Sequence, residues 1–167
     1  MMGRKIGVGV MLLALGGTHV AGAHAGIVDS PLPTIAAGKK TQHLYSIPGV
    51  INVTNLGTYV ACTSTAKATE VIAVEAFDSF GNVLNDVSQT STAVVPGVTV
   101  LFGTGAAAAL LIDRNLGIGT LHAGSARVLA TSKSFVCTAY ISDRTGNPPT
   151  GMTYLTIVAK TSQKAAN

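Results

Sequence analysis

Short apolar segments with a period of two constrain the fold of this 167-residue chain more than any other feature. Apolar and polar residues alternate within 58–64 and again within 71–78, as in strands that bury one face. Further strands are predicted at 88–95, 98–102, 125–131, 135–142 and 152–160, separated by turn residues. This spacing predicts an all-β fold, an antiparallel sandwich of seven to eight strands.

The N-terminal segment has the pattern of a targeting signal. Arg4 and Lys5 precede a short apolar run at 6–15, and small residues lead up to a predicted cleavage between Ala25 and Gly26. The run is about 10 residues long, which is well short of the roughly 20 that span a bilayer. We therefore expect an exported product without a transmembrane segment, located in the periplasm, at the cell surface or outside the cell.

Two cysteines, Cys62 and Cys137, lie on predicted strands with apolar neighbours on the same face. An exported chain meets an oxidising environment, so a single disulfide between them is expected. It would close a loop of about 75 residues, for which the chain-entropy model gives a stabilisation of about 4 kcal/mol.

The order Phe135-Val136-Cys137 places an aromatic residue two positions before a cysteine, and the hairpin at 77–83 can place Gly81 or Asn82 at a positive φ. The first motif is similar to the aromatic-x-Cys pattern of immunoglobulin-like modules, and the hairpin resembles turns in such modules of bacterial secreted and surface proteins. The resemblance covers roughly residues 43–160. It implies an immunoglobulin-like β-sandwich in which the disulfide connects the two sheets.

The chain divides into four predicted regions. They are a signal peptide (1–25), an extended leader (26–42), the β-sandwich domain (43–160) and a flexible C-terminal tail (161–167). The leader could also serve as a donor strand for a neighbouring subunit, although its Pro and Gly content makes it a poor strand former.

Charged residues make up only 11% of the chain, less than half of the roughly 25% in average globular proteins. The surface must therefore consist largely of neutral polar side chains, which repel a neighbouring copy weakly and protect strand edges poorly. The sequence has no cluster of basic residues of the kind that indicates nucleic-acid binding. Two interpretations follow: an ordinary exported protein with a neutral surface, or a subunit that packs against copies of itself.

The chemistry-bearing residues form no recognisable active-site motif. Ser125, His122 and Asp113 have the residue types of a catalytic triad, but no supporting motif surrounds the serine. Neither His122 nor His43 has a metal-ligand spacing. The sequence thus predicts a non-enzymatic protein without catalytic, metal-binding or cofactor-binding residues and without a cofactor.

Two further polar residues lie within predicted strands or turns. Asn52-Val53-Thr54 matches a glycosylation acceptor, a chance match if the signal is bacterial. Glu75 alternates with Val74 and is expected on the solvent side of its strand.

The long connection 103–125 is apolar and rich in glycine. A helix is one interpretation of 105–113, with a turn or an apolar strand as alternatives. Leu110, Leu111 and Ile112 form a possible interaction loop: they either cover an open end of the sandwich or present an apolar patch to another subunit.

These features favour a structural or protein-interaction role at the cell surface or outside the cell. The expected partner is another protein or a second copy of the chain, bound through strand edges or through the 103–125 loop. The alternative is a periplasmic or secreted module that binds a small ligand or a carbohydrate, which would require a concave pocket with convergent polar groups.

Overall fold

The computed structural model describes residues 26–27 and 30–160; the predicted signal peptide, with Ala25 at its cleavage site, and the predicted C-terminal tail lie outside the described residues. The described chain is all-β, with one helical turn. The elements are β1 (Gln42–Asn52), β2 (Leu56–Ser64), β3 (Glu70–Asp78), α1 (Val87–Thr90), β4 (Thr92–Val94), β5 (Thr99–Gly103), β6 (Arg114–Asn115), β7 (Leu121–Ala130), β8 (Phe135–Asp143), β9 (Met152–Tyr154) and β10 (Val158–Ala159).

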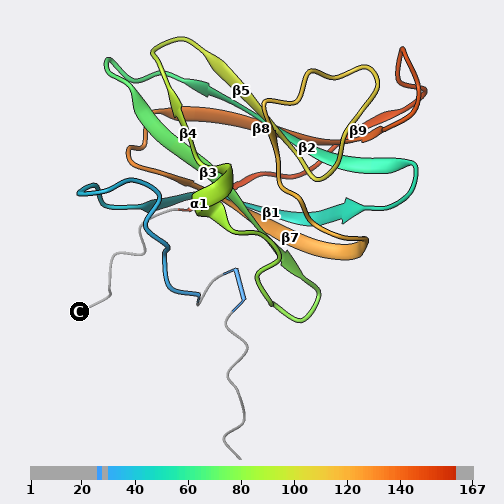
Figure 1. The fold of residues 1–167 in the computed structure, drawn as a ribbon, viewed down its shortest axis with the longest axis horizontal. Coiled ribbons are helices and arrows are strands. Elements are labelled where there is room, and N and C mark those ends of the chain that lie inside the picture. The colour runs from blue at the N-terminus through green and yellow to red at the C-terminus, as the bar shows by residue number, and fades with distance from the viewer. Residues whose placement is uncertain (1–25, 28–29, 161–167) are drawn as a thin grey trace, which may run out of the picture.

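Hydrogen bonds connect the ten strands into one sheet that has two distinct halves. The β7 half has the order β4-β3-β7-β1, with β10 paired to β1, and the β2 half contains β6, β5, β2, β8 and β9. A single residue pair, Asn52 with Gly57, connects the halves at the β1–β2 turn. Figure 1 shows β1 and β7 in the lower part of the view and β2, β8 and β9 in the upper part. All ladders are antiparallel except β5–β6.

The hydrophobic core draws side chains from both halves. Alternate residues of β3 and β7, such as Val74 and Val128, lie in one cluster with Val60 of β2, Phe102 of β5 and Phe135 of β8. Burying each such side chain stabilises the fold by roughly 1.5–3 kcal/mol. The period of two in these strands therefore reflects a shared interior, as expected from the sequence.

The longest strand, β1, escapes detection in the sequence because its buried residues are not spaced by two. Register shifts between His43 and Tyr45 and on both sides of Val50 break the regular alternation along β7. The core-facing residues consequently fall three apart, at Leu44, Ile47 and Val50. A β-bulge adds one unpaired residue to a strand and so shifts all later side chains.

Several expectations about local structure are wrong. The described chain has ten strands rather than seven to eight, and residues 152–160 form two short strands, β9 and β10, rather than one. Residues 88–95 are not one strand, because Asp86 caps a helical turn by accepting a hydrogen bond from the amide of Ser88, and the strand β4 is only three residues long. Residues 105–113 form no helix. There the backbone finds tertiary partners instead: Arg144 donates from Nε to the carbonyl of Ala106, and its own carbonyl accepts from Ala108.

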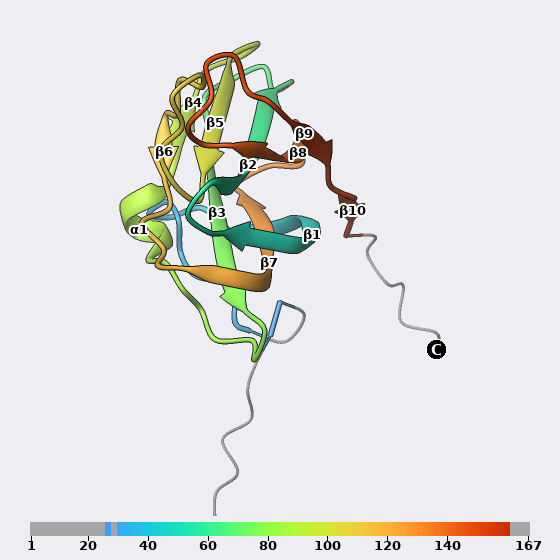
Figure 2. The ribbon, with the colours of Figure 1, turned by 90° about the vertical axis from the view of Figure 1, so that its right-hand side faces the viewer.

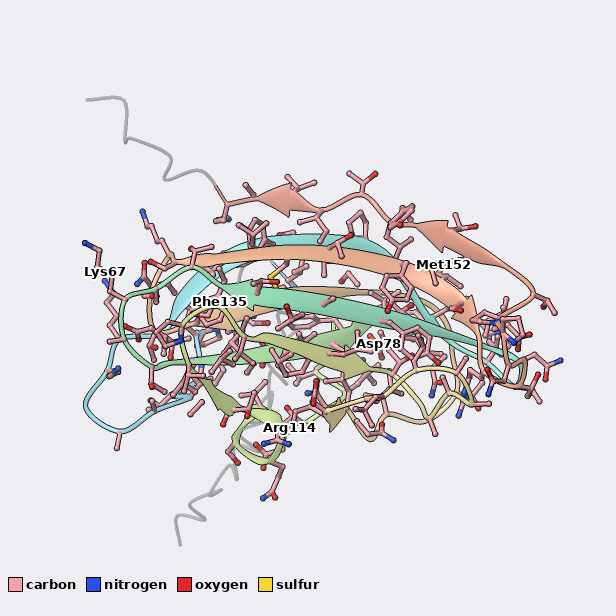
Figure 3. The ribbon with its side chains drawn as sticks, turned by 90° about the horizontal axis from the view of Figure 1, so that it is seen from above. Lys67, Asp78, Arg114, Phe135 and Met152 are labelled. Carbon is pink, nitrogen blue, oxygen red and sulfur yellow. A yellow bond between two sulfur atoms is a disulfide. The ribbon has the colours of Figure 1, made fainter. Side chains whose placement is uncertain are left out.

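The expected disulfide is confirmed, but its position is not the one that the immunoglobulin-like resemblance implies. Cys62 and Cys137 are directly opposite residues of the neighbouring strands β2 and β8, with 4.1 Å between their Cα atoms (Figure 3). A spacing this short is typical of a non-hydrogen-bonded antiparallel pair. The bond therefore fastens two strands of the β2 half and does not connect two sheets.

The turn between β3 and α1 is tied by one carboxylate. Asp78 accepts hydrogen bonds from the amides of Phe80 and Asn82, and Gly81 adopts a φ of 86°. The Asn82 side-chain amide also donates to Asp78, and this bond, together with the backbone bonds, holds the pKa of Asp78 below its usual range. The turn prediction is confirmed, whereas the returning strand amounts to a single bridge between Phe77 and Val83.

Within the described ranges, no helix has the length and apolar character needed to cross a membrane.

Candidate interaction surfaces

The face of β3 and β7 that points away from the core carries a buried ion pair. Arg127 donates from Nε to Oε2 of Glu75 at 2.5 Å, and the two side chains are only 1% and 6% exposed. The guanidinium also lies 5.2 Å from the ring centre of Phe77. The expectation that Glu75 faces solvent is therefore wrong: its face is covered, and the carboxylate is paired.

The cover over this ion pair comes from the leader. We call residues 30–35 the strap. Arg127 donates from Nη1 to the carbonyl of Ser30 and from Nη2 to that of Pro31, each at 2.9 Å. At the other end of the strap, Ile35 is buried in a small cluster with Ala73, Val87 and Leu129. In Figure 1 the leader, in blue, runs below α1 and then to its left, in the same part of the view as the start of β1.

His43 adjoins this covered face from β1. It is paired in register with Leu129, and its Nε2 lies 3.0 Å from both the Ser46 hydroxyl and the Tyr45 carbonyl oxygen. Burial lowers the pKa of His43, and the positive charges of Arg127 and Lys160 lower it further. The imidazole is therefore held in its neutral form as part of the polar network beside the ion pair.

The outward face of the β2 half is bare by comparison. We call its cross-strand neighbours the tyrosine face; they share one side of the sheet by register and are all uncharged: Ala61, Thr63, Thr99, Leu101, Val136, Thr138, Tyr140 and Tyr154. Val136 is 62% exposed and Tyr154 is 72% exposed. Figure 2 shows β9 at the margin of this half.

Aromatic rings run across one end of the tyrosine face. The ring of Tyr140 lies 5.7 Å from that of Tyr59 and 6.4 Å from that of Tyr154, measured between centroids. Tyr59 itself is fully buried, and its hydroxyl has no hydrogen-bond partner among the described residues. Burial raises the pKa of Tyr59 above its usual range. The aromatic row thus passes from a buried tyrosine to a solvent-exposed one.

The 103–113 segment covers Tyr59. A Cβ at Gly103 would lie 3.0 Å from the Ile112 side chain and 3.1 Å from the Tyr59 ring, so these groups are closely packed. Ile112 and Leu110 are half-buried, whereas Leu111 is 89% exposed. Of the three residues of the possible interaction loop, only Leu111 therefore points fully into solvent.

The same connection also helps to close the core, but with residues further along the chain. Leu116 and Ile118 are buried in the main cluster, and Asn52 fixes this stretch by donating to the carbonyls of Ile118 and Gly119. Because Asn52 is only 7% exposed and engaged in these bonds, the acceptor side chain of the glycosylation motif is buried, although Thr54 of the same motif is exposed.

Two surface hollows could hold a small ligand. The larger, about 410 Å³, lies between the β1–β2 turn and the β8–β9 loop. Its carboxylate, Asp143, accepts hydrogen bonds from Thr145 and Thr150, which hold its pKa well below the usual range. The smaller, about 220 Å³, lies between β4 and β5, where Arg114 donates to the Thr92 hydroxyl. Figure 3 shows Arg114 and Met152 on opposite sides of the molecule.

The residues with catalytic or metal-binding chemistry are not gathered into one site. The Asp113 carboxylate accepts from the amide of Leu101, and no hydrogen bond between described residues connects Asp113, His122 and Ser125. Within residues 26–27 and 30–160, no group of three or more His, Cys, Asp or Glu side chains is placed to hold a metal ion.

A sequence pattern other than period-two alternation indicates the buried ion pair: each of its residues lies within an apolar run. Glu75 lies within an almost unbroken apolar run at 71–77, and Arg127 lies within a similar run at 126–130. Runs of this kind indicate strands that are covered on both faces. A charge within one is expected to be buried and to need a partner.

Comparison with known proteins adds no further constraint to this geometry. No family model, curated protein or solved structure matches the chain.

Proposed function

We propose that this protein is an exported, non-enzymatic module with a structural or protein-interaction role, and that it binds other proteins or copies of itself through the tyrosine face. The observation that carries the proposal is the uncharged character of that face. A protein surface without charged groups has no like-charge repulsion to overcome when two copies meet face to face. Exposed Val136 and Tyr154 supply apolar area of the kind found at interface centres.

The proposal includes an immunoglobulin-like sandwich as the architecture. Support comes from the two halves of the sheet, which meet at a single residue pair and share one core. The Tyr45 hydroxyl also reaches across from β1 to the carbonyl of Phe135 in β8. Export is supported by the targeting pattern and is consistent with the disulfide.

The test is light scattering coupled to size exclusion on residues 26–167 over a wide concentration range. Parent protein is expected to increase in mass with concentration, and Val136→Lys is expected to abolish the increase because it places a charge at the centre of the tyrosine face. Val83→Lys is the matched control, since Val83 is similarly exposed but lies in the β3–α1 connection. A parent protein that stays monomeric, or an equal effect of both variants, would contradict the proposal.

The small-ligand alternative makes a different prediction for the same samples. The larger hollow offers a carboxylate whose hydrogen bonds are already used to fix its own loop. Binding of a sugar or small acid there would depend on the remaining lining groups. A monomer whose melting temperature rises with such a ligand would favour this alternative.

A further inference from the structure

The strap is bound in the way that a peptide ligand is bound. It pairs with no strand: Pro31 and Pro33 lack amide hydrogens, and residues 30–35 form no β-strand. Its contacts include two backbone carbonyls that accept from Arg127 and one buried aliphatic side chain, Ile35, whose amide donates to the Thr41 hydroxyl. Carbonyl recognition together with an apolar pocket is how extended proline-containing peptides are commonly held.

The part of the β3 and β7 face that the strap covers, which includes Ala73, Glu75, Arg127 and Leu129, has groups that match this occupant, and we call it the groove. Glu75 fixes Arg127 through Nε, which leaves the two Nη groups directed at the strap carbonyls. A buried ion pair stabilises a fold only when its remaining hydrogen-bonding groups are also satisfied. Strap binding supplies those partners and excludes water from the ion pair.

The connection between the strap and β1 can act as a hinge. Residues 37–40 are exposed. The chain reverses through a turn in which the backbone amide of Lys39 donates to the carbonyl of Ala36 and Gly38 has a φ of 70°. The tie from this turn to the sheet is a solvent-exposed ion pair, Lys39 with Glu70, at 3.2 Å. Opened to an extended chain, residues 36–40 reach roughly 16 Å.

We propose that the groove on β3 and β7 is a peptide-binding site that takes the strap of a second copy of this chain, so that copies are coupled by strap exchange. The same contacts form within one chain and between two chains, so exchange alters the turn at 36–40 and little else. Reciprocal exchange gives a closed dimer, and one-way exchange gives an open chain of subunits. The inference does not depend on the tyrosine face, which lies on the other half of the sheet.

The first experiment shortens the hinge. Deleting residues 37–39 leaves too little chain for the strap to turn back onto its own groove, so a dimer is expected at concentrations where the parent is monomeric. Adding Ile35→Asp to the deletion is expected to return the protein to a monomer, because the anchor no longer enters the apolar pocket. Adding Val136→Lys instead is expected to leave the dimer intact, which separates strap exchange from association through the tyrosine face.

A second experiment applies if the shortened chain does not fold. A fluorescent peptide of residues 26–40 is titrated into the full-length Ile35→Asp variant, whose own strap is released, and its polarisation is measured. The same peptide with Ile35→Asp should bind at least about tenfold more weakly. A folded deletion variant that stays monomeric, or a peptide that binds no better than its Ile35→Asp counterpart, would overturn the proposal.

Discussion

The two outward faces of the sheet differ in how far they are covered and in whether they carry charge. On the β7 half, a charged pair lies under a strap and is almost completely buried. On the β2 half, the tyrosine face is made of uncharged residues and remains open, with Tyr154 and Val136 in solvent. An unpaired charge on a covered face is strongly destabilising, whereas a charge on a solvent-exposed face has little effect on stability. The uncovered face is nevertheless the one made of uncharged residues, and this contrast is the basis for the proposed association through the tyrosine face.

The strongest way to break this comparison is to remove one member of the ion pair. Arg127→Ala should destabilise the protein by about 3–5 kcal/mol, because Glu75 is left charged and unpaired in a buried position. Urea unfolding followed by circular dichroism measures the loss. The double variant Glu75→Leu with Arg127→Met should recover most of the stability. If Arg127→Ala were no less stable than the double variant, water would have to reach the Glu75 carboxylate in the folded protein.

Loss of the disulfide, which joins two strands of the β2 half, should have the next largest effect on stability. Cys62→Ala with Cys137→Ala removes the covalent tie between β2 and β8 and is expected to cost about 2–4 kcal/mol. The midpoint of the variant in urea, compared with that of the oxidised parent, measures the effect. Equal midpoints for the oxidised and reduced parent would rule out a stabilising role.

A pair of truncations compares the two faces directly. Ile35→Ala should cost about 2 kcal/mol, because it removes the buried anchor of the strap. Tyr154→Ala should change the stability of the monomer by less than about 0.5 kcal/mol, since its side chain is mostly in solvent. The two free energies of unfolding should be measured at a concentration where the protein is monomeric. Similar values would remove the distinction between a covered face and a bare one.

The smallest expected effect is a dependence of stability on pH near the covered face. The folded protein lowers the pKa of His43, so it binds this proton less readily than the unfolded chain does. The contribution of His43 is therefore complete above its ordinary pKa of 6.5 and is lost as the pH falls through the lower folded value. His43→Gln should flatten this part of the stability profile, and an unchanged slope would assign the dependence to other groups.

The strands could be predicted from the sequence where alternation is undisturbed, and not elsewhere. β2 and β8 follow the period of two, and the pairing of Cys62 with Cys137 follows from there being no other cysteine. The register that makes this bond a cross-strand one depends on long-range pairing, which local patterns do not encode. β1 was hidden by its own bulges. The tyrosine face depends on the same long-range register, so no local motif marks it.

The cross-strand disulfide also determines how the molecule would respond to tension. Because Cys62 and Cys137 lie 75 positions apart in the chain yet 4.1 Å apart in space, the bond is a covalent shortcut past all the elements from β3 to β7. A load applied at the two ends would bypass the segment between the cysteines. Only the segments before Cys62 and after Cys137 could extend, starting with the strap and β1 on one side and with β9 and β10 on the other. In an oxidised subunit under tension, the strands between Cys62 and Cys137 would thus carry no load along the chain while the disulfide is intact.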